Sequence, residues 1–392
     1  MHPLIYIPRR RLVLPHGLRG LRNANNLVAS CGECGSAGSI GSGSVPFTPA
    51  SVLGANGAWW RRASGLFVKN TQPVFANPSF TTDTGWAKGT GWTLPGTTAN
   101  HASGVTSSVY QAVGITGNHY RMGYDCLSAD GTGTCGQFGG ALTAYATTTG
   151  ARIAEADQTA GGVQGVAAHS TTTAVIDNFT CENLSLTTLI PQAATGALAG
   201  TTLAQATAAA MPWDDGTGVK FDGSGDYLES SLAASAWPMH KAAGGTFGFK
   251  FRTSDAGGVL VGTNNYASAS VGFTIALLGG YIDVQVTNGT DQVFRTTDVV
   301  TAVADGAEHS VVVAWSSAGL QLRVDSAAVV TAAPGGSGFS AANASFTLRM
   351  AMRNGGTTSS DFAGTIRDFV AATGHASDSA QIALLNWLKA QP

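Results

Sequence analysis

The chain has 392 residues, of which 44% are hydrophobic and only 11% are charged, and glycine alone occupies 52 positions. This length allows two or three domains, and ample hydrophobic content with a net charge of only −2 excludes a disordered chain. Many short strands joined by turns of small residues fit this composition, so an all-β fold is predicted.

Positive charge is concentrated at the beginning of the chain. Residues 1–69 hold eight basic residues and one acidic residue, Glu33, which leaves 13 basic and 22 acidic residues in the remainder. A basic segment ahead of an acidic body indicates docking to an acidic partner, although contact between segment and body within one chain explains the pattern equally well. Nucleic acid is a weaker alternative and is not expected as a partner, because no folded reader motif accompanies the arginines.

Residues 1–70 are predicted to form an irregular, basic N-terminal arm that anchors the protein. The Gly/Ser-rich stretch 35–49 precedes GAWWRRASGLFVK (57–69), where two tryptophans adjoin two arginines. Interface cores are enriched in aromatic residues and arginine, although these tryptophans are equally compatible with folding back onto the neighbouring domain. The predicted docking residues are Arg9, Arg10, Arg11, Trp59, Trp60, Arg61 and Arg62.

The first 20 residues place their charges after a short apolar stretch, the reverse of a secretory signal, so synthesis in the cytoplasm is expected. No apolar run reaches the ~18 residues of a membrane span. Five cysteines exclude a fully paired disulfide framework within one chain. Cys126 and Cys135 flank a glycine-rich loop, where they either stay reduced or bridge a hairpin in an oxidising medium.

Residues 71–190 form a second part with strand propensity in 108–116, 119–127, 141–149 and 173–189. Residues 191–211 are small and of low complexity, which predicts a linker or a short helix.

Residues 212–392 form the third part, in which short strands recur at regular spacing. In 311–326, Val311, Val313 and Trp315 alternate along one strand, a four-residue turn follows, and a second alternating strand completes a hairpin. The other strand candidates are 219–223, 226–231, 245–253, 258–263, 271–278, 281–288, 293–298, 345–353 and 364–373. A short C-terminal helix is expected, capped by Ser377 or Asp378.

The third part resembles the laminin-G-like, or concanavalin-A-like, fold. The resemblance is carried by VKFDGSGDYLESS (219–231), GTFGFKFRT (245–253), the hairpin EHSVVVAWSSAGLQLRVDSAAV (308–329), and the closing strand and helix in 362–387. It implies a β-sandwich but no particular ligand, because a fold does not fix a function.

The second part resembles the jelly-roll carbohydrate-binding modules found in glycanases and phage virion proteins. NPSFTTDTGWAKGTGWTLPG (77–96), SVYQAVGITGNHYRMGYD (108–125) and AVIDNFTCENLSL (174–186) carry this resemblance. In such modules aromatic rings stack on sugars and amides orient them, although core packing is the alternative role for these side chains. The predicted glycan-binding residues are Trp86, Trp92, Tyr110, Gln111, Tyr120 and Tyr124. Asp177 matches the place of a structural calcium ion in some of these modules, without a full ligand set.

Together these features predict two tandem antiparallel β-sandwiches, both jelly rolls, preceded by the irregular arm and closed by one short helix. Catalysis is not expected. The paired carboxylates of glycoside hydrolases on this fold, in the order Glu-x-Asp-x-x-Glu, do not occur in the sequence, nor does a G-x-S-x-G nucleophile elbow.

A chain made in the cytoplasm with two sugar-binding-type folds fits a bacteriophage virion protein, such as a tail or capsid fibre, spike or decoration. Its arm would dock on capsid or tail subunits, its sandwiches would reach host surface glycans, and a homo-oligomer without sustained heptads is expected. Two alternatives stay open. One is a bacterial, non-catalytic carbohydrate-binding accessory protein, and the other is a purely structural particle component that binds no sugar.

Overall fold

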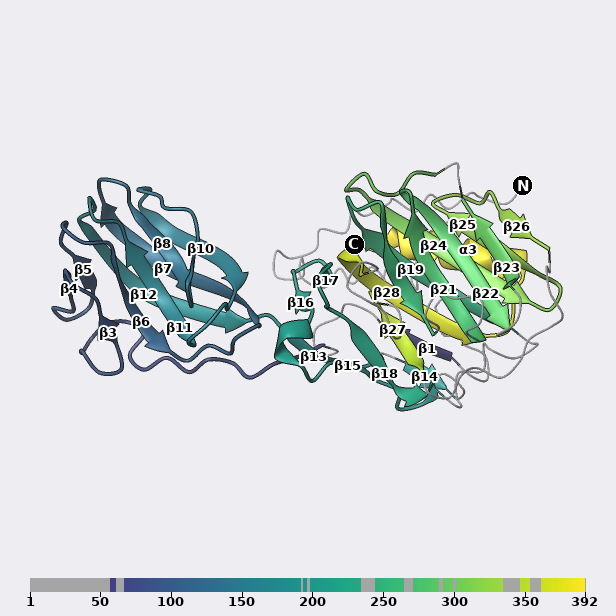
Figure 1. The fold of residues 1–392 in the computed structure, drawn as a ribbon, viewed down its shortest axis with the longest axis horizontal. Coiled ribbons are helices and arrows are strands. Elements are labelled where there is room, and N and C mark those ends of the chain that lie inside the picture. The colour runs from purple at the N-terminus through teal and green to yellow at the C-terminus, as the bar shows by residue number, and fades with distance from the viewer. Residues whose placement is uncertain are drawn as a thin grey trace, which may run out of the picture.

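The computed structural model describes residues 57–60, 67–191, 193–195, 198–233, 244–263, 271–288, 292–298, 301–333, 346–352 and 361–391. Within these ranges the chain forms four antiparallel sheets and one C-terminal α-helix, so the predicted all-β class is confirmed. Figure 1 shows two sandwiches side by side along the long axis of the molecule.

The smaller sandwich, here the insert sandwich, comprises residues 71–184 and two five-stranded sheets. The β7 sheet has the order β10 (Gly150–Asp157), β7 (His119–Ala129), β12 (Ala174–Asn183), β5 (Ala99–His101) and β4 (Trp92–Thr93). The β11 sheet has the order β3 (Ala87–Lys88), β6 (Ser107–Ala112), β11 (Val163–Ala168), β8 (Thr134–Phe138) and β9 (Ala141–Leu142). β7 alternates between buried and half-exposed residues from His119 to Cys126, as expected for a strand with one face on a core.

The larger sandwich, here the body sandwich, has two nine-stranded sheets. The β28 sheet runs β14 (Ala193–Thr195), β1 (Gly57–Trp60), β28 (Ala363–Thr373), β19 (Gly245–Arg252), β24 (Glu308–Ser316), β25 (Gly319–Val324) and β26 (Val330–Ala332), with β17 (Val219–Asp222) beside β28 and β16 (Trp213–Asp214) beside β17. The β21 sheet runs β2 (Phe67–Lys69), β13 (Leu186–Leu189), β15 (Leu203–Ala204), β18 (Leu228–Ala233), β27 (Thr347–Met350), β20 (Gly257–Gly262), β21 (Val271–Leu278), β22 (Tyr281–Asn288) and β23 (Gln292–Thr297).

The insert sandwich is nested within the body sandwich. β2 and β13 are antiparallel neighbours in the β21 sheet, and just beyond them the backbone N–H of Asn70 donates to the carbonyl of Ser185 at 2.8 Å. The chain therefore leaves the body at residue 70 and returns beside the same point at residue 185.

The predicted arm and the predicted linker both contribute strands to the body sandwich. β1 and β2 come from the predicted arm, yet both pair within sheets of the body sandwich. The predicted linker 191–211 likewise contains β14, β15 and a 3-10 helix, η3 (Ala208–Ala210). These elements are two to four residues long, and so short a segment gives almost no periodic signal in a sequence.

The body core is built around the predicted hairpin, which forms as β24 and β25 with Trp315 opposite Leu320. The Trp315 ring is fully buried, lies parallel to Phe247 with a centroid separation of 5.4 Å, and packs against Phe273 at 5.1 Å. The hairpin is thus the element that joins the two sheets through one aromatic cluster.

Helix α3 (Asp378–Ala390) closes the body sandwich. Ser377 caps it by accepting from the N–H of Ala380, as one of the two predicted caps. Its buried face, which includes Leu384 and Leu388, packs on Val312 and Val370 of the β28 sheet. No helix in the described ranges is long and apolar enough to cross a membrane.

A compact joint holds the two sandwiches together. The side-chain amide of Asn118 accepts from Asn70 at 2.8 Å and from Asn183 at 2.9 Å, and it donates to the carbonyl of Ala208 in η3 at 3.3 Å. Beside this network, the ring of His119 in β7 stacks on Trp213 in β16 with centroids 4.2 Å apart. Because Asn118 and Asn183 are fully buried, the joint orders the insert relative to the body.

Candidate functional site

Five of the six residues predicted to bind glycan lie in the insert core, which corrects that assignment. Their exposed fractions are 6% for Trp86, 4% for Trp92, 5% for Gln111, 0% for Tyr120 and 3% for Tyr124. Polar atoms of two of them bind the backbone: the indole N–H of Trp86 donates to the carbonyl of Asn77, and the Tyr120 hydroxyl accepts from the N–H of Ile115. A small sandwich needs its large rings inside, so these side chains present no surface to a ligand.

Tyr110 is the exception among the six. It is half-buried on β6, and its Cβ lies against Gly165 of the adjacent strand β11 on the outer face of the β11 sheet. Gln111, next to it, points inward and closes a loop through two hydrogen bonds with the backbone of Ala76.

The structure describes only some of the other predicted site residues. Arg9, Arg10, Arg11, Arg61 and Arg62 lie outside the described residues, and Trp59 and Trp60 are described only as backbone in β1. Asp177 lies at a bulge of β12, where it accepts from the N–H of Asn178, whose side chain donates to Asp125. No group of three or more His, Cys, Asp or Glu in the described ranges is placed to hold a metal ion.

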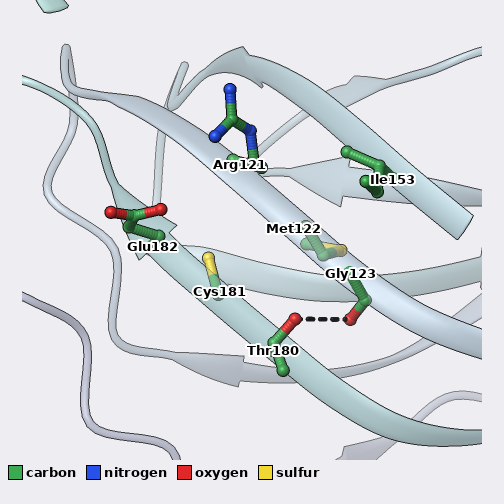
Figure 2. A pocket seen from close by; sticks show the side chains of 7 residues that line it. All are labelled: Arg121, Met122, Gly123, Ile153, Thr180, Cys181 and Glu182. Atoms are coloured by element: carbon green, nitrogen blue, oxygen red, sulfur yellow. Dashed lines mark hydrogen bonds between the residues drawn. The ribbon is translucent and has the colours of Figure 1, made fainter. Parts of the chain in front are cut away.

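A groove on the surface of the insert has the shape and the polar groups expected of a ligand-binding site. The outer face of the β7 sheet carries a groove of about 230 Å³ lined by Arg121, Met122, Gly123, Ile153, Thr180, Cys181 and Glu182. Figure 2 shows the charged ends of Arg121 and Glu182 at one side of the groove and Ile153 at the other.

The groove exists because Gly123 has no side chain. Gly123 in β7 is paired with Ile153 in β10 on one side and with Thr180 in β12 on the other, so the three positions share one row of the sheet. A Cβ on Gly123 would stand 2.6 Å from Thr180 Oγ1, which instead donates to the Gly123 carbonyl at 3.3 Å (Figure 2). The missing side chain leaves a hollow whose floor is backbone and whose walls are the neighbouring side chains.

The next row of the sheet supplies charge. Arg121 is paired with Glu155 on one side and Glu182 on the other, and its Nε donates to Glu155. Glu182 is held instead by Lys69 of β2, with 2.6 Å between Oε1 and Nζ. Donors and acceptors of hydrogen bonds therefore stand together along one edge of the hollow.

The thiol of Cys181 at the groove favours its neutral form. Burial raises the pKa of the Cys181 thiol to about 12, and the charge of Glu182 raises it further in the same direction. A neutral thiol is a poor nucleophile, so the groove offers hydrogen bonds and contact rather than covalent chemistry.

Two further hollows lie on the body sandwich. One, of about 480 Å³, lies at the turn of the hairpin and is lined mostly by small neutral residues from Ser316 to Gln321 and from Thr331 to Ala333, with His375. The other, of about 90 Å³, is lined by residues that include Arg252, Glu308 and Arg367. The insert groove alone combines an exposed apolar side chain, a backbone floor and charged groups of both signs, so among the described residues it is the strongest candidate.

No sequence pattern marked the groove residues. They come from three strands that are distant in the sequence, and β10 was not among the predicted strands. One usable signal was Gly123 in the middle of the alternating run 119–127, since a glycine inside a strand often marks a close approach or a hollow.

One comparison with known proteins bears on the body sandwich. The family model for the Laminin G domain matches residues 251–371, which confirms the resemblance stated for this part of the chain. The match covers less than half of the chain. The chain matches no curated protein sequence.

Solved structures show more distant similarity. The CBM40 of Ruminococcus gnavus IT-sialidase, solved with α2,6 sialyllactose, aligns with 14% identity, 43% coverage of this chain, 96% of that chain and a TM-score of 0.34. The binding domain of botulinum neurotoxin serotype D aligns with 10% identity, 44% and 42% coverage and a TM-score of 0.32, and that of serotype C1 with 10%, 48%, 49% and 0.35. The chain spans less than half of each toxin fragment. Similarity at this level identifies no ligand for this chain.

Proposed function

We propose that this protein is a non-catalytic, lectin-like binding protein that recognises carbohydrate with the groove on the β7 sheet of its insert sandwich. The observation that carries the proposal is the hollow at Gly123, bordered by Arg121 and Glu182 on one side and by Ile153 on the other. A sugar ring has hydroxyls that both donate and accept hydrogen bonds around an apolar ring face, and this pattern matches the groove.

Each part of the groove has a counterpart on such a ligand. Within the part of the chain that the structure describes, only Nε of the Arg121 guanidinium has a hydrogen-bond partner, which leaves both Nη groups to donate to sugar oxygens. Glu182 has 47% of its side chain exposed and offers Oε2 as an acceptor, since Lys69 binds Oε1. Ile153 is 74% exposed and provides an apolar contact for C–H groups. A volume of about 230 Å³ is below the ~300–1,000 Å³ usual for drug-sized ligands, so the groove suits one sugar residue.

A glycan array probed with the full chain tests this proposal, followed by titration calorimetry with the best ligand. Arg121→Gln keeps a polar side chain but shortens it and removes the charged donor, so affinity is expected to fall at least tenfold, in line with loss of a charged hydrogen bond. The variant should keep the thermal unfolding midpoint within a few degrees, because Arg121 pairs at the surface.

Tyr110→Ala serves as the discriminating variant, since Tyr110 lies on the outer face of the opposite sheet. Unchanged binding in Tyr110→Ala, with loss in Arg121→Gln, supports the groove. Loss in Tyr110→Ala alone would place the site on the β11 sheet, and absence of any glycan binding would refute the function.

We further propose that the protein works at the surface of a bacteriophage virion, with its basic N-terminal residues docked on a capsid or tail subunit. The support is the excess of seven positive charges in residues 1–69 and the resemblance of residues 77–186 to modules found in virion proteins. Because β1 starts at Gly57, the informative deletion is residues 1–56, which spares the body sheets. The shortened protein should fold but fail to join particles assembled in its presence, and normal incorporation would contradict the docking role.

A further inference from the structure

We infer that the groove selects uncharged sugars and rejects carboxylated ones, and that Lys69 of the body sandwich tunes this selectivity from outside the groove. The inference rests on the proposed function, because it concerns the ligand of the same groove. It follows from how the charges around Arg121 are distributed and paired.

Negative charge exceeds positive charge around the groove. Two cations and four carboxylates lie around the groove and at the joint, which gives a balance of −2 when only Lys, Arg, Asp and Glu are counted. They are Lys69, Arg121, Glu155, Asp157, Glu182 and Asp214. His119 belongs to the same chain of contacts, with Nδ1 2.7 Å from Asp157 and Nε2 3.9 Å from Glu155.

Each cation is already matched by a carboxylate. Arg121 binds Glu155, and Lys69 lies 2.6 Å from Glu182 and 3.7 Å from Asp214. A carboxylated sugar at Arg121 would therefore lie near the carboxylates of Glu155 and Glu182. The one cation that it could bind, Arg121, is already paired with Glu155. Like charges placed together at a binding site are the common means of rejecting a wrong ligand.

Lys69 controls how much of the Glu182 charge reaches the groove. Glu182 lies directly across the strand pair from Arg121, yet its Oε1 is bound by Lys69, which projects from β2 of the body. Without Lys69 the net charge around the groove would change from −2 to −3. Glu182 would then be released toward Arg121 and compete with a ligand for the Nη groups of Arg121. The body sandwich thereby contributes a specificity-determining residue to a site on the insert.

The test uses the full chain on an array in which neutral glycans are printed beside their sialylated and uronic-acid counterparts. The measured quantity is the ratio of neutral to acidic binding. We expect the unaltered protein to favour the neutral member at least tenfold at low salt, with a smaller ratio at 0.5 M NaCl because screening weakens charge repulsion. Glu182→Gln should lower the ratio at least threefold.

Lys69→Met should raise the ratio while weakening neutral binding severalfold. Lys88→Met is the matched control, since Lys88 is about as exposed as Lys69 and its ion pair, with Asp83, lies on β3 of the opposite sheet; it should leave the ratio unchanged. Equal or tighter binding of acidic members by the unaltered protein overturns this inference and leaves the proposed function standing. An array on which no glycan binds overturns both, and a ratio that does not respond to Glu182→Gln or to Lys69→Met refutes the role given to that residue.

Discussion

The two sandwiches solve the same packing problem with different side chains. In the body, a hydrocarbon core of Phe, Val, Leu and Ile surrounds Trp315, and α3 covers part of the outer face of one sheet. In the insert, a smaller core relies on Trp86, Trp92, Tyr120 and Tyr124, whose polar atoms mostly bind backbone or a core threonine. The outer face of the β7 sheet meanwhile presents its groove to solvent. Aromatic residues of the insert therefore fill its small core, whereas charged and small residues line the groove on its surface.

The nested topology predicts that the two sandwiches can be separated. Replacing residues 71–184 by Asn-Gly should leave the body folded, because Asn70 and Ser185 are already hydrogen-bonded neighbours at the end of an antiparallel pair. A two-residue Asn-Gly turn is the usual closure for such a pair. Residues 71–184 alone should also fold, since their core cluster contains no residue of the body. Circular dichroism and calorimetry of both fragments provide the measurement.

Both fragments should melt cooperatively, with midpoints lowered by loss of the joint around Asn118. A body fragment without a melting transition would show that the insert belongs to the same folding unit as the body, and that the two sandwiches cannot be separated.

A pair of core substitutions sharpens the same comparison within the intact chain. Trp315→Ala should destabilise the body by about 3–5 kcal/mol, and Trp92→Ala should do the same to the insert, since each removes a buried ring that its surroundings cannot replace. In calorimetry each variant should lower a different unfolding transition. Val74→Ala, at a side chain that is 83% exposed, is the control and should change neither.

If both variants lower one shared transition, the two sandwiches unfold as a unit because the joint couples their unfolding. Trp92→Ala also loses any glycan binding through unfolding of the insert, so loss of binding in that variant does not identify a binding residue.

Long strands were predicted from the sequence more successfully than the order of strands in the sheets. Long alternating runs predicted their strands well: β21 and β22 have the predicted limits 271–278 and 281–288, and the hairpin of Trp315 formed as expected. The order of strands in space was harder. β1 and β2 were assigned to an arm because three or four residues carry no periodicity, and only long-range pairing reveals their place.

The predicted site failed for a related reason. An aromatic residue in an alternating strand faces either the core or the solvent, and a shift of one position exchanges the two faces. Tyr120 and Tyr124 share the parity of Met122 and Cys126 on the inward face, whereas Arg121 and Gly123 face outward. The two tyrosines chosen on β7 because of the resemblance therefore have the inward parity.

Asp226, in the body sandwich beside the joint, makes the stability of the protein depend on pH. This is the smallest of the stability effects predicted here for the two sandwiches. Its carboxyl lies between β17 and β18, is 4% exposed and accepts from the N–H of Asp222. Burial raises its pKa to about 8, and the charges of Asp222 and of Asp157, from the insert, raise it as well. The folded state therefore holds a proton that the unfolded chain, with an ordinary Asp pKa near 3.9, releases.

The sign of the pH dependence follows from this difference. Between about pH 4 and pH 8 the folded state binds more protons than the unfolded state, so stability from this group is complete at low pH and is lost as pH rises through about 8. Asp226→Asn keeps the shape without the ionisation. It should stabilise the protein relative to the unaltered chain, by about 3–4 kcal/mol more at pH 8 than at pH 5, as measured by urea unfolding.

Asp255→Asn is the control, because Asp255 is exposed on the same sandwich and should show no such change. The contribution of Asp157 can be isolated by repeating the Asp226→Asn comparison in the body fragment that lacks residues 71–184. Without the insert carboxylate the pKa of Asp226 should be lower, so the gain from Asp226→Asn at pH 8 should shrink. An equal gain in the fragment and in the full chain would mean that Asp226 responds to the body alone, and that the joint carries no electrostatic coupling between the two sandwiches at this position.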